Sequence, residues 1–175
     1  ATVPIDDRIT AVELTEQLAD LGAGVLLDSL TSGLTRGVAQ SIDGITYARK
    51  ITSDDRRLDW SLPAEQLQRI VRIGGAWTTF GDDRFKVLSA RPIPEIDAEV
   101  QSALDVPALD VPGTVRGTSV VCGDGTSMLL ESVQPQGKAP MDAVSWVNGA
   151  RPEGRVLGLE PSELGMEQGS ARTDG

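Results

Sequence analysis

Residues 76–90 read AWTTFGDDRFKVLSA and carry the clearest structural pattern in the chain. Residues 76–80 and 85–90 are rich in residues that favour strands, and the GDDR between them is typical of a hairpin turn. A second pair of strands is expected at 114–122 and 126–134, on either side of the turn residues GDG. The sequence therefore predicts a small domain built around two β-hairpins.

Toward the N-terminus, residues 11–30 predict an amphipathic helix. Thr10 and Glu13 form a capping-box pattern, in which each side chain satisfies a free backbone N–H of the first turn. Apolar residues then recur at helical spacing, while Gly22 and Gly24 lower the helix propensity enough to allow a break. A lone amphipathic helix is unstable. We therefore expect its apolar face to pack on a partner that is missing from this chain or supplied by the next domain.

A second helix is expected between the first helix and the hairpins, with Ser61 as its cap and Pro63 near its first turn. Its buried stripe is expected to contain Leu62, Leu67, Ile70 and Val71. A short third helix is expected around 141–147, and residues 92–112 are expected to form a long loop. The predicted class is α+β, with a helical segment at 1–33, a linker at 34–48, a small β-barrel-like domain at 49–158 and a disordered tail at 159–175.

Composition excludes several classes of site. The chain has no histidine, which excludes histidine general-base chemistry and histidine metal sites. The single cysteine, Cys122, cannot form an internal disulfide, and a metal cluster would need more ligands. The net charge of −10 argues against a broadly basic nucleic-acid binder. Residues 41–158, however, carry 13 basic and 16 acidic side chains, so much of the acidity lies outside the expected β domain.

The expected cellular location rests on two sequence patterns that the chain lacks, a membrane span and a signal peptide. No run approaches the roughly 20 apolar residues that a membrane span requires, and residues 1–8 lack the pattern of a signal peptide. We therefore expect a cytoplasmic protein without membrane contact. We also expect it to be a monomer. Because the chain does not begin with Met, we also expect it to begin within a longer protein.

Four groups of motifs follow one another along the chain. They are Pro4-Ile5 with Thr10 and the apolar positions of 14–27; TYARKI at 46–51 with LDWS at 58–61 and Pro63-Ala64; RIVR at 69–72 with GAWTTF at 75–80 and FKV at 85–87; and Leu129-Leu130 with QPQGK at 134–138, Met141, Trp146 and NGAR at 148–151. In this order they resemble the methionyl-tRNA formyltransferase family over about residues 3–158. The chain departs from the family at 73–75, where a Pro-rich turn is usual, and in the acidic stretch 92–112.

The resemblance implies a function for the intact protein. A member of this family moves a formyl group from its co-substrate, formyl-tetrahydrofolate, to the amino group of initiator methionyl-tRNA. The resemblance implies that 1–33 is the end of the α/β catalytic domain and that 49–158 is an OB-like barrel that binds the tRNA. The family's catalytic and folate-binding residues lie upstream of Ala1. We therefore expect the chain to bind no cofactor, to be inactive alone, and to have the tRNA and the missing N-terminal catalytic domain as partners.

Two alternatives remain open. One is a formyltransferase that acts on another amine, such as a nucleotide sugar; it would share the upstream domain, but the motif at 134–138 is not expected there. The other is a free-standing RNA-binding or scaffolding module without a catalytic partner. The apolar helix at 11–30 argues against the module, because its apolar face requires something to cover it.

Five cations are the candidate tRNA contacts: Arg49, Lys50, Arg72, Lys86 and Lys138. Side-by-side cations such as Arg49 and Lys50 can bridge phosphates without reading bases. Lys138 follows a glycine that permits close backbone approach, and Lys86 is expected to point outward from its strand. Arg72 and Arg69 lie one helical turn apart and could form one basic ridge. The alternative for each is a solvated surface charge, which we prefer for Arg69.

Aromatic and thiol side chains are interpreted as structural. Trp60, Trp77 and Trp146 could stack on bases, but each has apolar neighbours and is expected to anchor the core. Asp59 is expected to accept a capping or linker hydrogen bond rather than to act as a general acid. Cys122 is expected to be a small buried side chain.

Overall fold

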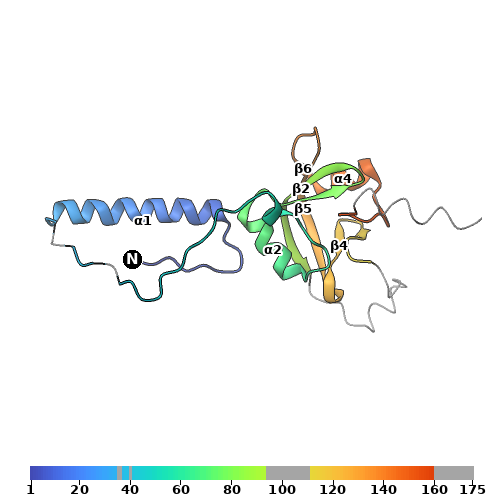
Figure 1. Ribbon diagram of the computed structural model, residues 1–175. Coiled ribbons are helices and arrows are strands. Elements are labelled where there is room, and N and C mark those ends of the chain that lie inside the picture. Colours follow the sequence, from blue (N-terminus) through green and yellow to red (C-terminus); the bar gives the residue numbers. More distant parts are fainter. Residues whose placement is uncertain (35–36, 40, 94–110, 160–175) are drawn as a thin grey trace, which may run out of the picture.

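The computed structural model describes residues 1–34, 37–39, 41–93 and 111–159. Figure 1 shows a long helix, α1 (Ala11–Thr31), that extends away from the rest of the molecule. The strands and the helices α2 (Ala64–Ile73) and α4 (Ala143–Ala150) lie together beyond the N-terminal end of α1. The structure is therefore α+β, as predicted. None of its described helices is both long enough and apolar enough to cross a membrane.

Helix α1 begins at the predicted capping box. The Thr10 hydroxyl accepts from the Glu13 backbone N–H at 3.2 Å, and the Glu13 carboxylate accepts from the Thr10 N–H at 2.8 Å. The helix continues through Gly22 and Gly24 without the break that the sequence allows. Each glycine costs about 1 kcal/mol relative to alanine, which is less than the loss of several helical hydrogen bonds. No residue of α1 is buried, so its apolar face is uncovered within the described residues.

Six antiparallel strands form one sheet. Five of them follow in the order β1-β2-β5-β4-β3, where β3 is Val115–Arg116 and β4 is Ser119–Val121. The sixth, β6 (Met141–Asp142), pairs with β5. The central strands are β2 (Asp83–Ile93) and β5 (Ser127–Pro135). Strand β1 (Trp77–Phe80) pairs with β2 as the first predicted hairpin. Phe80 opposes Asp83, so the turn contains two residues rather than the expected four. Strand β2 continues to Ile93, and the expected loop and tail lie largely outside the described residues.

The predicted strand at 114–122 is wrong in detail, because this segment is itself a hairpin. It consists of β3 (Val115–Arg116) and β4 (Ser119–Val121). Gly117 turns the chain with a φ of 56°, a conformation that glycine adopts readily. Its N–H donates to the Glu153 carboxylate at 2.8 Å. A bond to a residue 36 positions away therefore helps to fix a turn that the local sequence signals weakly.

The described strands do not close into a barrel by strand pairing, so the predicted OB-like barrel remains a prediction. The segment 155–158, which lies outside the named strands, nevertheless contacts both edges of the sheet. Its Arg155 carbonyl accepts from Val115 N–H at 2.9 Å beside β3, and its Gly158 N–H donates to the Thr79 carbonyl at 2.9 Å in β1. This segment covers backbone groups that would otherwise be exposed at the two edges.

The cap of α2 differs from the prediction. Pro63, rather than Ser61, occupies the N-cap position. The Ala64 N–H of the first turn donates instead to the hydroxyl of Thr126, at 3.0 Å. Ser61 donates from its N–H and hydroxyl to the Asp59 carboxylate, which confirms the hydrogen-bonding role expected for Asp59. A side chain 62 positions away therefore replaces the local cap.

The third helix begins later than expected. Residues Met141–Asp142 form β6, and α4 starts at Ala143. Asp142 is its N-cap and accepts from the Ser145 N–H at 2.8 Å. The expected position of a helix in this region is confirmed, and its first turn is displaced because Met141 and Asp142 pair with β5.

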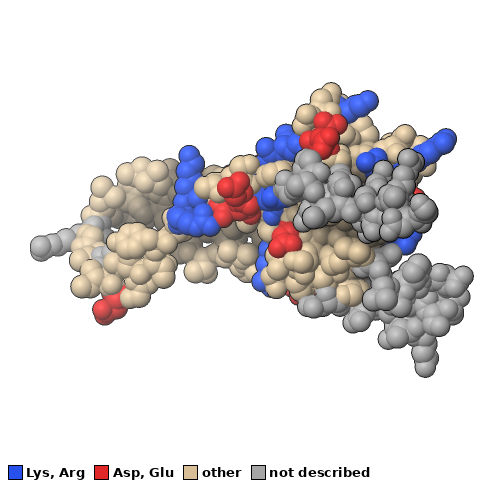
Figure 2. Space-filling model, turned by 45° about the vertical axis from the view of Figure 1, so that its right-hand side comes forward, with Lys and Arg blue, Asp and Glu red and all other residues tan. Residues whose placement is uncertain are grey.

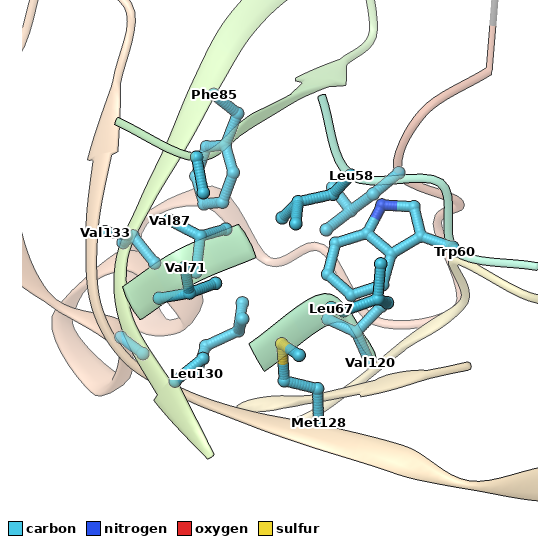
Figure 3. Packing of buried hydrophobic residues seen from close by; sticks show 14 of the residues in the cluster. Leu58, Trp60, Leu67, Val71, Phe85, Val87, Val120, Met128, Leu130 and Val133 are labelled. Atoms are coloured by element: carbon cyan, nitrogen blue, oxygen red, sulfur yellow. The ribbon is translucent and has the colours of Figure 1, made fainter. Parts of the chain in front are cut away.

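The core lies between α2 and the inner face of the sheet (Figure 3). Leu67 and Val71 of α2 are buried, and Leu62 and Ile70 pack against the cluster, as the predicted stripe requires. Cys122 is buried, and burial raises the pKa of its thiol to about 12. The thiol therefore stays protonated at neutral pH and is chemically inert there. Figure 3 labels the residues Leu58, Trp60, Leu67, Val71, Phe85, Val87, Val120, Met128, Leu130 and Val133.

Candidate nucleic-acid interface

The outer face of β1, β2 and β5 carries one of the predicted cations, Lys86. Phe85 and Val87 point into the core, so the intervening Lys86 points outward and is exposed, as predicted. In the strand register Lys86 opposes Trp77 on one side and Gln134 on the other. Directly opposed residues share a face of an antiparallel sheet. The three side chains therefore form a row across the outer face.

Trp77 lies on this face and is only half-buried, so the prediction that it anchors the core is wrong. The Arg84 guanidinium lies over its ring, 4.2 Å from the centroid, and that of Arg57 lies 5.7 Å from it. These distances are within the range of cation–π attraction. The indole N–H donates to the Ser53 carbonyl at 2.8 Å. Trp77 departs from the expectation because its strand position faces outward.

Trp60 and Trp146 are core residues, as predicted, with 4% and 3% of their surface exposed. The ring of Trp146 lies 4.6 Å from that of Phe85, between centroids. Trp60 donates from its indole N–H to the buried Thr78 hydroxyl at 3.1 Å. Both indoles are therefore engaged inside the fold and unavailable for stacking on a base.

The turn at 134–138 is attached to the β1–β2 hairpin. Gln136 accepts from the Arg84 backbone N–H at 3.0 Å through its side-chain oxygen. Gln134 donates from its side-chain amide to the Lys138 carbonyl at 2.9 Å. Gly137 has a φ of 70°, which reverses the chain before the exposed Lys138. These bonds bring the predicted residues Lys86 and Lys138 to the same region of the surface.

A surface pocket of about 190 Å³ lies between this turn and the hairpin. Its cationic residues are Arg84 and Lys86, and its remaining walls come from Gln134, Pro135, Gln136 and Gly137. We call it the hairpin pocket. Its lining offers two positive charges and two side-chain amides, a combination that suits an anionic ligand.

Arg49 and Lys50 lie before the short helical turn Asp54–Arg56, and the two differ in their partners. Arg49 makes a two-point ion pair with Asp55, one bond of which joins Nη1 to Oδ2 at 2.7 Å. Arg49, together with hydrogen bonds from Thr52, holds the pKa of Asp55 well below its usual range. Lys50 is exposed and makes no ion pair with the described residues. Its charge is therefore less compensated than that of Arg49.

Arg72 lies in the last turn of α2 and contacts a different part of the molecule. Its guanidinium donates to the Asp6 carbonyl at 2.7 Å, which attaches α2 to the segment before α1. The Asp6 carboxylate accepts from the Arg8 and Ile9 N–H groups, which, with a smaller contribution from the Arg72 charge, lower its pKa. Arg72 also lines a depression of about 680 Å³ together with Arg8 and Arg91. It is not among the residues that line the hairpin pocket.

Sequence reasoning missed Arg57 and Arg84, the two cations beside Trp77, and also Arg155, which lies beside a different ring. Arg155 covers the Phe80 ring at 4.3 Å from its centroid. Arg84 could have been found, because it is two residues before Lys86 on one strand and therefore shares its face. Arg57 and Arg155 carry no such signal, since only the tertiary structure places them beside aromatic rings. Figure 2 shows Lys and Arg side chains scattered over the visible face of the β-rich part, with Asp and Glu side chains among them.

Similar proteins agree on one family. Residues 50–151 match the family described as formyl transferase, C-terminal domain. Curated proteins named methionyl-tRNA formyltransferase are similar over most of the chain. The protein from Frankia casuarinae is 37% identical over 85% of this chain, and that from Streptomyces coelicolor is 38% identical over 85%. The protein from Mycolicibacterium vanbaalenii is 39% identical over 81%. The aligned regions cover 49%, 48% and 46% of these relatives, so the chain spans about half of their length.

Solved structures show a related fold. Two variants of HypX from Aquifex aeolicus superpose with TM-scores of 0.57 and 0.58, at 15% and 14% sequence identity. They cover 84% and 86% of this chain, which corresponds to 27% of each HypX chain. At this identity the likeness concerns the fold alone. The sequence matches identify the family, and this chain belongs to the methionyl-tRNA formyltransferase family, whose formyl transferase C-terminal domain it contains.

Proposed function

We propose that the intact protein transfers a formyl group from formyl-tetrahydrofolate to the amino group of initiator methionyl-tRNA, and that this chain holds the tRNA. The observation that carries the proposal is the similarity to proteins of that name across the helical segment and the β-rich domain together. A free-standing RNA-binding module would not need the helical segment. The remaining half of the relatives' length is where we expect the catalytic domain.

The division of labour follows from the side chains available. The cations of the outer face are lysine and arginine side chains, which suit the binding of phosphates. Positioning of the methionyl amine and removal of its proton require other groups, which we place in the upstream domain together with the folate. We expect the segment 155–158, which is hydrogen-bonded to both edges of the sheet, to complete an OB-like closure. Such a closure would hold these cations on one rigid surface.

The proposal is tested with the intact protein and with residues 1–175. We expect the intact protein to formylate methionyl-tRNA from formyl-tetrahydrofolate, and residues 1–175 to bind the tRNA without transferring the formyl group. Transfer of radioactive formyl to acid-precipitable tRNA measures the activity, and filter binding measures the affinity. Transfer to the amine of a nucleotide sugar, with none to methionyl-tRNA, would exclude the proposed substrate. Formyl transfer by residues 1–175 alone would overturn the placement of the chemistry upstream.

Two lysines predicted from the sequence give a second test. Because a broad positive field is excluded by the net charge of −10, affinity should depend on a few local contacts. Lys50→Ala and Lys138→Ala should each weaken tRNA binding and lower the slope of log affinity against log salt by about 0.7–0.9. In the intact enzyme the KM for tRNA should rise, while folate binding stays unchanged.

Arg69→Ala is the matched control for these lysines, because Arg69 is an exposed cation of α2. We expect its affinity and salt slope to equal those of the wild type. If the two lysine variants behave like this control, both lysines are solvated surface charges and the tRNA is held elsewhere.

A further inference from the structure

We propose that the hairpin pocket is a phosphate-binding subsite, in which Arg84 and Lys86 hold one backbone phosphate of the bound RNA and Trp77 positions Arg84. The inference rests on the proposed function, since it names the contact that the outer face makes. It adds Arg84, which the sequence did not single out, to Lys86, which it did. It also gives Trp77 a role other than stacking on a base.

The pocket has the size and lining that a phosphate needs. Its volume of about 190 Å³ is well above the roughly 10–15 Å³ that one water molecule requires by the same measure. Arg84 and Lys86 lie two positions apart on β2 and therefore project from the same face, roughly 7 Å apart along the strand. Arginine presents donors in a planar fork that matches the oxygens of a phosphate. Lysine adds a point charge that can approach from the side.

The charges of Arg84 and Lys86 are uncompensated among the described residues. Some other surface cations have carboxylate partners: Arg49 is paired with Asp55, and Arg91 lies 3.4 Å from Glu131. Neither Arg84 nor Lys86 makes an ion pair with a described residue, although both are close to the hairpin turn. Asp83 of that turn accepts from the Gln136 amide at 3.3 Å instead. The two cations are therefore available to an external anion.

Arg84 is held in place before any ligand binds. Its guanidinium lies on the Trp77 ring and donates from Nη2 to the Ser53 hydroxyl at 3.1 Å. Trp77 is itself fixed by the bond from its indole N–H to the Ser53 carbonyl. Ordering an arginine side chain costs rotamer entropy, and the contacts made on folding have already ordered Arg84 before a ligand binds. This pre-organisation is the reason to assign Trp77 a positioning role.

The arginine side chains beside the Trp77 ring argue against a base at this position. Base stacking requires an open aromatic face, whereas the guanidinium groups of Arg84 and Arg57 lie within 4.2 and 5.7 Å of the ring centroid. A base that stacked on the face covered by Arg84 would have to displace the arginine that is proposed to hold the phosphate. The geometry therefore favours contact with the RNA backbone, which carries no sequence information.

The test uses the 175-residue chain, with initiator tRNA as the probe and binding measured at several salt concentrations. Arg84→Gln and Lys86→Gln should each weaken binding about 10-fold, the effect of losing one charge-assisted hydrogen bond. Each should also lower the salt slope by about 0.7–0.9. Asp82→Asn, which removes an exposed negative charge of the same hairpin, should strengthen binding. An unrelated RNA of equal length should respond in the same proportion, because the contact is with the backbone.

The role of Trp77 is tested by a double-mutant cycle. Trp77→Leu should weaken binding in the wild-type background and should add no loss when Arg84 is already glutamine. Trp77→Phe keeps an aromatic face and should restore part of the affinity. Equal losses from Trp77→Leu in both backgrounds would show that Trp77 does not act through Arg84.

The outcomes separate this inference from the proposed function. If the wild-type chain binds tRNA while Arg84→Gln and Lys86→Gln retain its affinity and slope, the subsite is wrong and the proposed function stands. If the wild-type chain does not bind tRNA, both are wrong. Thermal unfolding of each variant identifies loss of the fold. If Arg84→Gln unfolds, Lys86→Gln alone tests the subsite. It alters an exposed side chain without partners among the described residues, so it should not disturb the fold.

Discussion

Replacement of Gly123 by alanine is expected to destabilise the β-rich domain by about 3 kcal/mol or more, the upper range for inserting a group into a packed site. A Cβ at this position would lie 1.9 Å from the Ser61 carbonyl oxygen and 2.6 Å from its carbon. Both are backbone atoms, so no rotation of a side chain relieves the overlap. The Gly123 N–H also donates to the Leu62 carbonyl at 3.0 Å, and separation of the two segments would lengthen that bond. Urea unfolding followed by tryptophan fluorescence measures the change.

Gly149→Ala is the control for this substitution. Gly149 lies in α4, and a Cβ added there would meet nothing within 4 Å. Alanine favours a helix over glycine by about 1 kcal/mol, so this variant should be as stable as the wild type or more stable. A Gly123→Ala protein with wild-type stability would contradict the close approach of the two backbones.

Trp146→Ala should have the second large effect, a loss of about 3–5 kcal/mol in the free energy of unfolding. Trp146 is 3% exposed and packs edge-on against Phe80, with 5.5 Å between ring centroids, as well as against Phe85. Removal of the indole leaves a cavity that rigid neighbours on two strands cannot fill. The midpoint of urea unfolding should fall accordingly.

Trp77→Ala provides the comparison, because Trp77 lies half-buried on the outer face and outside the core cluster. Its loss of stability should be clearly smaller than that of Trp146→Ala, while its loss of RNA affinity should be larger. Equal losses of stability would mean that Trp77 also anchors the core, as the sequence alone indicates.

Elements set by neighbouring residues were predictable. The capping box of Thr10 and Glu13 needs only residues three positions apart, and the structure contains both of its hydrogen bonds. The β1–β2 hairpin likewise follows from strand formers around a turn, and the outward position of Lys86 follows from alternation along the strand. The burial of Trp60 and Cys122 is consistent with their apolar surroundings.

Elements set by distant residues were not predictable. Thr126 replaces Ser61 at the start of α2, and Glu153 supports the turn at Gly117. Neither partner can be identified from one sequence, because hydrogen bonds between segments leave no periodic pattern. The same is true of Arg57, which reaches Trp77 only because its segment lies beside β1.

The sequence by itself determined the family, the helix α1, the first hairpin and the lysines that we propose as tRNA contacts. Its local signals are sufficient for these, since caps, turns and alternating strands depend on residues a few positions apart. The tertiary structure decided which cations lie together. It placed Arg84 and Lys86 against the turn that leads to Lys138, and it joined Arg72 to Asp6 instead. The physical reason is that strand register and backbone contacts between distant segments, rather than spacing along the chain, fix the distances between surface charges.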